Sequence, residues 1–499
     1  MLDFIFYRDI NGKNRLFYDV KGETFTSSST LDRLLSEILY KPKANLQSIK
    51  DFIWTFSIHP QDTFYEGIHR VPPGYKLFLE DGSISVQRWW KPENIKIDYT
   101  LSLEEAKIRF NQILEKSVEK CIEDKDNIGC ELSGGFDSSS IFCIASQKSK
   151  SITALTMEFD NKEANEQDYA NSVFQHCSKK EDIHYKVKSD CIDYKNKYTM
   201  KYNYDLNPHW PIWTTFTMKS HILEYLLAND IKTVLNGQFG DPILYSTPNV
   251  LEIYLYQRKI FRFFKELFYL EKPFRWIYKF LKKKLLLLLN PKLKENIKKF
   301  LKRRNKDIHQ NKYYDFYFDL SSFKDYEINK RIINLLTNAN FYMFVDSNFS
   351  RSVSDKYNIE FCSPYGDKDL IEFMLTLPPT YLYSMGNRRN FHGFCMQKIL
   401  PKKLINRRDK AFFSQTIIDQ IHAIDRKLLW KNATIVSMGI VTYEYIMALE
   451  KKFSMQTISS QDRSLYWRMI NIEYWYTLNP HLNKSEFAPN PYVLESCKD

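Results

Sequence analysis

The chain has 499 residues, of which 43% are hydrophobic and 16% aromatic, a composition that excludes a disordered protein. Its length is sufficient for two or three domains with large cores. No stretch of about 18 apolar residues occurs, so we expect no transmembrane helix. The start of the sequence lacks the basic residues and the small-residue cleavage site of a secretory signal, and we therefore expect a cytoplasmic protein.

The net charge of +12 is concentrated in one segment. Residues 251–310 contain 18 Lys and Arg against 5 Asp and Glu, an excess that accounts for the whole net charge. No nucleic-acid-binding motif accompanies this segment, so we expect no nucleic-acid partner. The eight cysteines are scattered and form no Cys-x-x-Cys pair, so we expect reduced thiols, mostly in the core, and no zinc site.

Residues 1–98 are expected to form a small β-rich domain. Hydrophobic and polar residues alternate at Phe4–Tyr7, Leu16–Val20 and Tyr75–Leu79, as they do in half-buried strands. Asp81-Gly82 directly follows the last of these strands and is a strong signal for a hairpin turn. Helical spacing of apolar residues begins soon after residue 98, which places a domain boundary there.

In residues 99–499, strands and helices first alternate, which predicts a parallel α/β sheet, and the part after about residue 330 is mostly helical. The expected strands are 127–132, 152–159, 183–187 and 231–235, and the expected helices are 101–122, 138–148, 164–177 and 215–228. Ligands of such sheets bind beyond the carboxyl ends of the strands. Three loops leave strands at that edge: 133–137, 158–166 and 236–241.

The first of these loops is typical of a pyrophosphate-binding loop that holds ATP. It lies in the stretch Leu132-Ser133-Gly134-Gly135-Phe136-Asp137-Ser138-Ser139. Two adjacent glycines let backbone N–H groups approach phosphate oxygens, and the following helix directs its positive end at the same anion. Asp137 would repel phosphate unless a cation lay between them, so the motif implies Mg²⁺.

Two other interpretations of this motif are a structural turn and the Leu-Ser-Gly-Gly signature of transport ATPases. The signature also requires a Gly-x-x-x-x-Gly-Lys-[Ser/Thr] loop, which this chain lacks. A strand, a Ser-Gly-Gly-x-Asp-Ser-Ser loop and an apolar helix in direct succession favour the nucleotide site.

A second carboxylate follows the last of the predicted strands, in Asn236-Gly237-Gln238-Phe239-Gly240-Asp241. By itself this sequence is equally compatible with an ordinary turn. Because the carboxyl ends of parallel strands lie at one edge of a sheet, Asp137 and Asp241 are expected to hold Mg²⁺ together against pyrophosphate.

Residues 251–310 form a basic, aromatic and leucine-rich helical stretch, and three interpretations of it stay open. It is a helical insertion with a solvated basic face, a surface that docks a peptide or protein, or a site of peripheral membrane contact. The lysines at 282–284 are followed by five leucines, Leu285–Leu289, a stripe too short to anchor a protein on its own.

A cationic cluster, Arg407-Arg408-Asp409-Lys410, follows Leu400-Pro401 later in the chain. When a carboxylate attacks the α-phosphate of ATP, the transition state is strongly negative, and a lysine would stabilise it electrostatically. A basic turn alone is usually only solvated, so this role needs the context of the other motifs.

The order of these motifs resembles the synthetase domain of the asparagine synthetase family over roughly residues 100–420. The matching stretches are 132–139, Asn165–Ala170, Gly237–Asp241, Ser363–Asp367, Leu400-Pro401 and Arg407–Lys410. Residues 64–74 also resemble the end of that family's N-terminal glutaminase domain. The resemblance implies a parallel-sheet PP-loop ATPase fold and a carbon–nitrogen ligase that cleaves ATP to AMP and pyrophosphate.

The resemblance also assigns roles to individual residues. Those expected to hold pyrophosphate are Ser133, Gly134, Gly135, Asp137 and Ser138, and those expected to line the AMP moiety are Leu132, Met157 and Gly237. Asp137 and Asp241 would ligate Mg²⁺, and together with Lys410 they form the expected catalytic set.

The chain departs from the family pattern at the residues that supply ammonia. Members that make asparagine carry a cysteine nucleophile next to the initiator methionine, where this chain has Leu2; its first cysteine is Cys121. Leucine has no nucleophilic atom, so we expect a truncated glutaminase-like domain without glutaminase activity. Gln238 replaces a glutamate of the family, and Pro242 and Cys362 replace an acidic residue and an arginine.

A chain that keeps the adenylating residues without an ammonia supply is expected to use another nucleophile. Of the branches of the family, it resembles the lasso-peptide cyclases most. These enzymes activate an Asp or Glu side chain of a ribosomal peptide, and the peptide's own N-terminal amine then forms an isopeptide ring. The resemblance implies a precursor peptide as substrate, with a maturation protease and a leader-binding protein as partners.

Two alternatives stay open. One is an asparagine-synthetase-like ligase that uses ammonia or a small amine, including β-lactam-forming relatives, and the other is a non-catalytic homologue that binds nucleotide or peptide. The joint presence of Asp137, Asp241 and Lys410 argues against the non-catalytic homologue. Glu166 in the second loop is either a proton acceptor or an ordinary acidic helix start.

Overall fold

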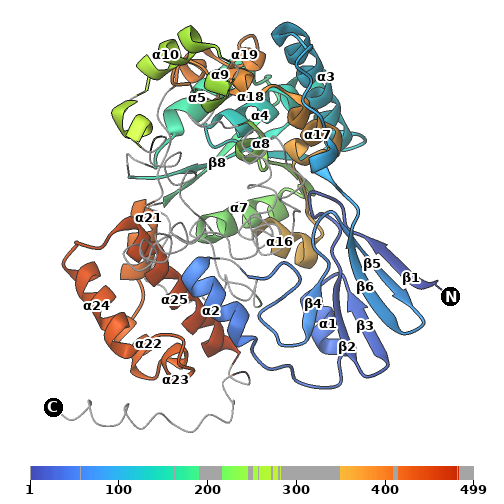
Figure 1. Ribbon diagram of the computed structural model, residues 1–499, viewed down its shortest axis with the longest axis vertical. Helices are drawn as coiled ribbons and strands as arrows, with labels where there is room; N and C mark the ends of the chain where they lie inside the picture. Colours follow the sequence, from blue (N-terminus) through green and yellow to red (C-terminus); the bar gives the residue numbers. More distant parts are fainter. Residues whose placement is uncertain are drawn as a thin grey trace.

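The computed structural model has three parts: an N-terminal β-rich domain, an α/β unit and a C-terminal group of helices (Figure 1). The residues that it describes are 2–56, 58–161, 164–189, 209, 216–244, 251–256, 258–270, 273–278, 281, 349–387, 389–407, 414–479 and 482. Within these ranges no helix is long and apolar enough to cross a membrane.

Two three-stranded antiparallel sheets form the N-terminal domain, with strand orders β1-β5-β6 and β3-β2-β4. Their bounds are β1 Leu2–Tyr7, β2 Phe17–Lys21, β3 Thr24–Ser28, β4 Ile68–Arg70, β5 Tyr75–Glu80 and β6 Ser83–Arg88. Two helices, α1 (Leu31–Glu37) and α2 (Leu46–Thr55), complete this domain. Asp81 and Gly82 both have positive φ, as a two-residue hairpin between β5 and β6 requires, so the predicted turn is confirmed.

The α/β unit contains a five-stranded sheet in the order β11-β10-β7-β8-β9, in which all neighbouring strands are parallel. The strands are β7 Ile128–Glu131, β8 Thr153–Glu158, β9 Ile183–Lys188, β10 Thr233–Leu235 and β11 Glu360–Cys362. The predicted parallel sheet is therefore confirmed, although β10 is shorter than expected and β11 was not expected.

Helices cover both faces of this sheet. On one face, α3 (Leu103–Ile122), α4 (Phe136–Lys148) and α5 (Gln167–Cys177) pack in a core that contains Cys130, Ala154 and Leu235 from the strands. On the other face, α7 (Phe216–Ala228) and α16 (Phe349–Tyr357) pack against Leu155 and Val234. Adjacent strand residues such as Val234 and Leu235 thus lie in different cores, because strand side chains alternate between faces.

The remaining described elements are mostly helical, as predicted. They are η1 Pro92–Asn94, α8 Gly240–Leu244, α9 Leu251–Tyr256, α10 Ile260–Phe268, η5 Pro364–Gly366, α17 Lys368–Thr376, α18 Pro379–Leu382, α19 Asn390–Met396, α20 Lys402–Ile405, α21 Ser414–His422, α22 Arg426–Lys431, α23 Thr434–Ser437, α24 Tyr443–Ser454 and α25 Ser460–Leu478. The Lys282–Leu289 stretch of the basic segment lies outside the described residues.

The N-terminal domain packs on the C-terminal helices through α2, which lies beside α25 (Figure 1). Arg468 of α25 is buried, and its Nε donates a hydrogen bond to the Ile53 carbonyl at 2.8 Å. Trp54 Nε1 donates to the Ile440 carbonyl at 3.3 Å. These contacts join residues near the two ends of the chain into one core.

One pair of cysteines corrects the expectation of reduced thiols. Cys143 of α4 and Cys177 at the end of α5 form a disulfide that links the two helices on one face of the sheet. Cys130, Cys362 and Cys395 are free and buried, as expected of small core residues. The disulfide was not expected because its cysteines are 34 residues apart and follow no recognisable spacing.

Candidate active site

The Ser-Gly-Gly loop lies at the carboxyl end of β7, where it turns sharply into α4. Gly134 has φ +84°, and a Cβ at this position would lie 2.6 Å from the Glu166 carbonyl oxygen and 2.9 Å from the Ala170 nitrogen. The first loop therefore packs directly against the start of α5. A residue with a side chain does not fit at Gly134 without moving backbone.

Serine side chains shape the rest of this loop. The N–H of Ser133 donates to Ser138 Oγ at 3.1 Å, the two hydroxyl oxygens are 2.9 Å apart, and the N–H of Gly135 donates to Ser133 Oγ at 3.2 Å. Gly135 is the N-cap of α4 and supplies no side-chain cap. The positive end of a 13-residue helix thus faces a loop of small polar residues, which is a favourable site for a phosphate group.

The third loop packs against the first. A Cβ at Gly237 would lie 2.7 Å from the Ser138 nitrogen, and one at Gly240 would lie 2.4 Å from Asp137 Cγ. Asn236 ties this loop to the stretch after β11, because its N–H donates to the Cys362 carbonyl and its Oδ1 accepts from Ser363 Oγ at 2.7 Å. Ser363–Asp367, one of the stretches that resemble the family, is therefore a fourth loop at this sheet edge, a position that was not predicted because β11 was not expected.

The two predicted metal ligands converge on Arg389. One guanidinium contacts both Asp137 carboxylate oxygens, with Nη1 at 2.5 Å and Nη2 at 2.8 Å, and Nη2 also donates to Asp241 Oδ1. Burial lowers the pKa of Arg389, but the Asp137 and Asp241 carboxylates raise it by more, so the guanidinium stays charged. Asp137 and Asp241 thus lie at one site, as predicted, and already share a cation.

Arg389 was missed at the sequence level. It lies just before α19, in the run Asn387-Arg388-Arg389, which matches none of the motifs considered above. It is 252 residues from Asp137 and 148 from Asp241, so only the folded chain brings the three together.

The donor set at this position fits Mg²⁺. Two carboxylates that converge on one cation are the hard oxygen ligands that Mg²⁺ prefers, with water and phosphate oxygens in the remaining positions. The described ranges contain no group of three or more His, Cys, Asp or Glu side chains arranged for a metal. A metal at Asp137 and Asp241 would accordingly depend on the nucleotide for part of its coordination.

A buried polar network centred on His392 contacts Asp137. His392 of α19 is fully buried; its Nε2 lies 3.0 Å from Ser140 Oγ and 3.2 Å from the Tyr365 hydroxyl. Its Nδ1 lies 3.5 Å from Asp137 Oδ1. Burial, together with the nearby Arg389 charge, holds the pKa of His392 well below its usual range, so this imidazole is neutral.

Lys410 lies outside the described residues, but the chain just before it is held at the site. Arg407 Nη1 donates to the Gly134 carbonyl at 3.1 Å and forms an ion pair with Glu166 Oε1 at 2.5 Å. The guanidinium carbon also lies 4.3 Å from the centre of the Tyr169 ring. Glu166 is the N-cap residue of α5, and its carboxylate is engaged by Arg407.

The residues expected to line AMP lie along the same edge. Leu132 is buried directly after β7; its N–H donates to the Leu155 carbonyl, and its carbonyl accepts from Thr156 Oγ1 at 2.7 Å. Met157, near the end of β8, is partly buried. Together with Gly237 after β10, these residues come from three neighbouring strands of the sheet.

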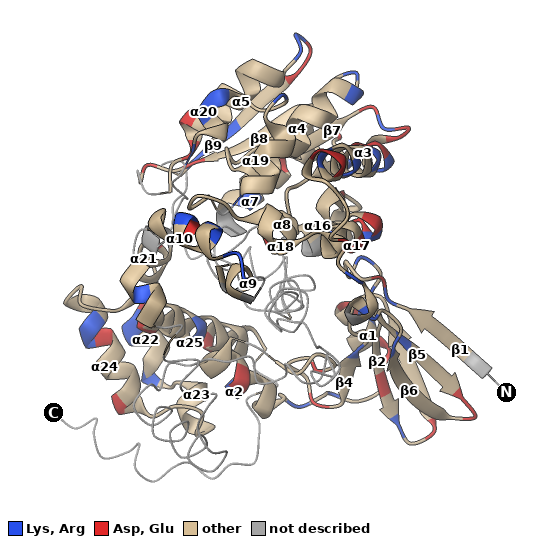
Figure 2. Ribbon diagram, turned by 45° about the horizontal axis from the view of Figure 1, so that its top comes forward, with Lys and Arg blue, Asp and Glu red and all other residues tan. Residues whose placement is uncertain are grey.

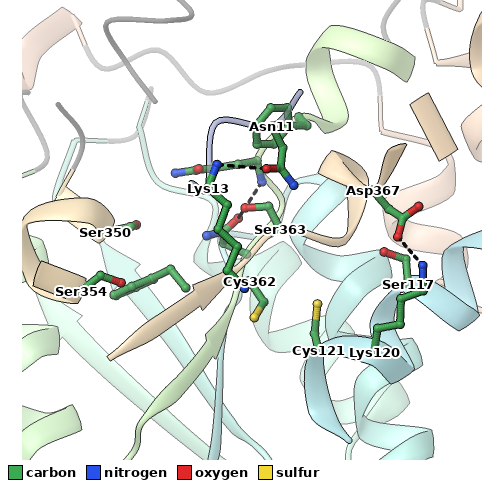
Figure 3. A pocket seen from close by; sticks show the side chains of 14 residues that line it. Asn11, Lys13, Ser117, Lys120, Cys121, Ser350, Ser354, Cys362, Ser363 and Asp367 are labelled. Atoms are coloured by element: carbon green, nitrogen blue, oxygen red, sulfur yellow. Dashed lines mark hydrogen bonds and ion pairs between the residues drawn. The ribbon is translucent and has the colours of Figure 1, made fainter. Parts of the chain in front are cut away.

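A cavity of about 140 Å³ lies beside the third loop, where the N-terminal domain meets the α/β unit (Figure 3). Its lining includes Lys13 from the N-terminal domain and Gln238 from the third loop. Figure 3 shows the sulfur atoms of Cys121 and Cys362 directed toward each other across it. The thiol of Cys121 donates a hydrogen bond that lowers the pKa of Cys362.

Comparison with known protein families agrees with this architecture. The family model described as "Asparagine synthase" matches residues 109–477, and the model described as "Glutamine amidotransferase domain" matches residues 3–90. A comparison with curated proteins gave no match. The first match covers more than half of the chain and contains the parallel sheet and all of its loops, and proteins of this family are ligases that use ATP as a substrate. The chain therefore belongs to the asparagine synthase family and carries an N-terminal domain of the glutamine amidotransferase type.

Proposed function

We propose that this protein activates a carboxylate as an acyl adenylate and joins it to an amine. The observation that carries the proposal is the convergence of Asp137 and Asp241 on one cationic position beside the Ser-Gly-Gly loop. A loop with a helix N-terminus suits the pyrophosphate of ATP, and the two carboxylates suit its Mg²⁺. Mg²⁺ held by Asp137 and Asp241 would neutralise charge on the pyrophosphate leaving group.

The chemistry has two steps. A carboxylate oxygen attacks the α-phosphorus of ATP, the bond to the β-phosphate oxygen breaks, and pyrophosphate leaves. The amine nitrogen then attacks the carbonyl carbon of the adenylate, AMP leaves with the bonding electrons, and the amine gives up a proton. In the first step, the first loop orients pyrophosphate through its N–H groups, and Lys410 stabilises charge on the α-phosphate.

We further propose that the carboxylate belongs to a ribosomal peptide, whose N-terminal amine closes the ring. Residues 1–120 contain no cysteine, so the N-terminal domain has no thiol to release ammonia from glutamine. Gln238, an amide where asparagine-forming relatives have a carboxylate, lines the cavity at the domain junction. A precursor peptide, a leader-binding protein and a maturation protease would then be partners in the cytoplasm, where ATP is available.

Asparagine formation from ammonia is the second candidate. The match of residues 3–90 to the glutamine amidotransferase domain favours it, because that domain is the usual source of ammonia for this reaction. The absence of cysteine from these residues argues for an external supply of ammonia or of another small amine.

The adenylating activity is tested by the exchange of labelled pyrophosphate into ATP in the presence of Mg²⁺ and a carboxylate substrate. Wild-type protein is expected to catalyse exchange, and Asp137→Asn to reduce it about a hundredfold or more, since a ligand for the metal is lost. If the wild type exchanges pyrophosphate no faster than the variant with every carboxylate offered, the proposed ligase activity is rejected. The protein would then be one that binds nucleotide or peptide without catalysis.

The identity of the amine is tested separately by mass spectrometry of two reactions. In one, a linear peptide encoded near the gene should lose the mass of one water molecule and resist aminopeptidase. In the other, aspartate and ammonium should give no asparagine. Asparagine formation together with an unchanged peptide would reject macrocyclisation and support the second candidate.

A further inference from the structure

The start of the basic segment exposes an unusual number of large hydrophobic side chains. Those most exposed between residues 260 and 281 are Phe261 (87%), Phe268 (84%), Phe274 (84%), Tyr278 (64%) and Phe264 (60%). Single exposed apolar residues are normal on a protein surface, but several adjacent aromatic rings mark a contact site.

Three of these rings lie on one face of α10. Phe261, Phe264 and Phe268 have the i, i+3, i+7 spacing that aligns side chains along a helix. The buried residues of the same helix, Phe263 and Leu267, lie on the other side and pack in a small core with Tyr254 and Tyr383. The helix is therefore attached to the protein by one apolar face and presents a second one outward.

The attachment of α10 is specific. Glu266 is buried and accepts hydrogen bonds from Ser384 Oγ at 3.0 Å and from the N–H of Met385 at 2.5 Å. A Cβ at Gly386 would lie 2.9 Å from the Tyr269 carbonyl oxygen, so the turn at 384–387 packs closely on the end of the helix. The aromatic face is thus held in a fixed orientation, and α10 lies at the outer edge of the α/β unit in Figure 1.

The exposed charged side chains of the described residues 258–270 and 273–278 are all positive. Arg258, Lys259, Arg262, Lys265 and Arg275 are all exposed. Within residues 258–270 and 273–278, the buried Glu266 is the one acidic residue. Figure 2 shows the basic positions along α10 in blue. An anionic surface is accordingly the complement of this face.

We propose that this face, defined by Phe261, Phe264, Phe268 and the cations beside them, docks the protein on an anionic lipid bilayer. Aromatic rings flanked by Lys and Arg are typical of side chains in the headgroup region of a membrane. Each cation near an anionic bilayer adds electrostatic attraction, which salt weakens. The proposal is independent of the reaction that the enzyme catalyses.

A bilayer explains the geometry better than a peptide does. The rings project from a single convex helix and two of them are more than four-fifths exposed, so a partner must surround each ring to remove it from water. Lipid chains and headgroups do so, whereas a bound peptide covers one side of a ring. The alternative of a basic helix that is only solvated accounts for the cations, but it does not account for the aromatic rings that are exposed to water.

The test is co-sedimentation of the full-length protein with vesicles of phosphatidylcholine alone or mixed with phosphatidylglycerol. We expect binding to the mixed vesicles, weaker binding in high salt, and little binding to phosphatidylcholine alone. Phe261→Ser, Phe264→Ser and Phe268→Ser together should lower the partition coefficient at least about tenfold, because three apolar anchors are lost. Replacing the same three residues by tryptophan should preserve binding.

A matched control is a variant with three exposed hydrophobic residues changed elsewhere, Leu39→Ser, Ile108→Ser and Leu428→Ser, which are 103%, 57% and 64% exposed. It should bind vesicles as the wild type does, and the melting temperatures of all variants should agree. Equal binding by the α10 serine variant and the wild type would overturn the proposal. Failure to bind vesicles while binding an acidic, aromatic peptide would also overturn it, in favour of a peptide-docking face.

Discussion

Arg389 neutralises the Asp137 and Asp241 carboxylates in this structure, at the position where a magnesium ion would lie. The guanidinium and the metal should therefore compete for the same oxygens in the absence of nucleotide. We expect Arg389→Gln to bind Mg²⁺ at least about tenfold more tightly than the wild type, measured by isothermal titration calorimetry without ATP. Arg389→Lys should have an intermediate Mg²⁺ affinity, since lysine keeps the positive charge but lacks the planar guanidinium that contacts both oxygens of a carboxylate. Identical Mg²⁺ affinities in the wild type and both variants would contradict the idea that Arg389 and Mg²⁺ compete for the same carboxylates.

His392 predicts how stability depends on pH. Burial and the nearby Arg389 charge hold the pKa of His392 well below its usual range, whereas in the unfolded chain it is about 6.5. Below about pH 6.5 the unfolded chain takes up a proton that the folded protein refuses, so stability is full above that pH and falls as the pH is lowered. The melting temperature should therefore decrease from pH 7 to pH 5.

The contribution of His392 is measured by the slope of melting temperature against pH. We expect the slope to be smaller in His392→Gln than in the wild type. The control His221→Gln changes a histidine whose side chain is 38% exposed, and it should keep the wild-type slope. A slope that is the same in all three proteins would show that His392 is not the responsible group. Burial lowers the pKa of His184 to about 4, so His184 should account for part of the slope that remains in His392→Gln.

At the scale of elements, the first and third loops are packed so closely that glycine is required between them. A Cβ at Gly240 would lie 2.4 Å from Asp137 Cγ. We expect Gly240→Ala to lower the free energy of unfolding by about 1–3 kcal/mol and to reduce pyrophosphate exchange, because the aspartate must move. Chemical denaturation measures the first effect.

The matched substitution is Gly393→Ala in α19, where the nearest atom is Phe136 Cε1 at 3.8 Å. This helical position has room for a methyl group, so the change should stabilise the protein by about 0.5–1 kcal/mol. Equal free energies of unfolding for the two alanine variants would show that close packing is not what requires a glycine at position 240.

The elements that the sequence predicts well are those whose own pattern is strong. The alternation of strands and helices between residues 99 and 235 predicts the parallel sheet, and the Ser-Gly-Gly loop predicts the turn into α4. β11 has three residues, and its register is set by pairing with β10, as in Val234 with Phe361, so its own sequence carries little signal. Arg389 was missed for a related reason, because its function depends on partners that only the tertiary structure brings near.

At the scale of the whole molecule, the N-terminal domain is held to the C-terminal helices by α2. Arg468 reaches across this contact to the Ile53 carbonyl, and its guanidinium carbon lies 5.3 Å from the centre of the Phe56 ring. Burial lowers the pKa of Arg468 to about 10, so it is still charged at neutral pH. The N-terminal domain and the C-terminal helices thus share a buried, charged contact.

We expect Arg468→Ala to lower the free energy of unfolding by about 1–3 kcal/mol, because a buried carbonyl loses its donor. Limited proteolysis should then cut within or just after residues 1–98 sooner than in the wild type. Arg463→Ala, on the same helix but half-buried, should have a much smaller effect. Equal resistance to protease in both variants would mean that other contacts hold the domain in place.

The contacts of Arg407 with the Gly134 carbonyl and the Glu166 carboxylate hold the first loop in place. Arg407 and Gly134 are 273 residues apart in the sequence, and the folded chain fixes them relative to each other. The entropy lost in ordering this loop is therefore lost once, when the chain folds, and not again each time a ligand binds.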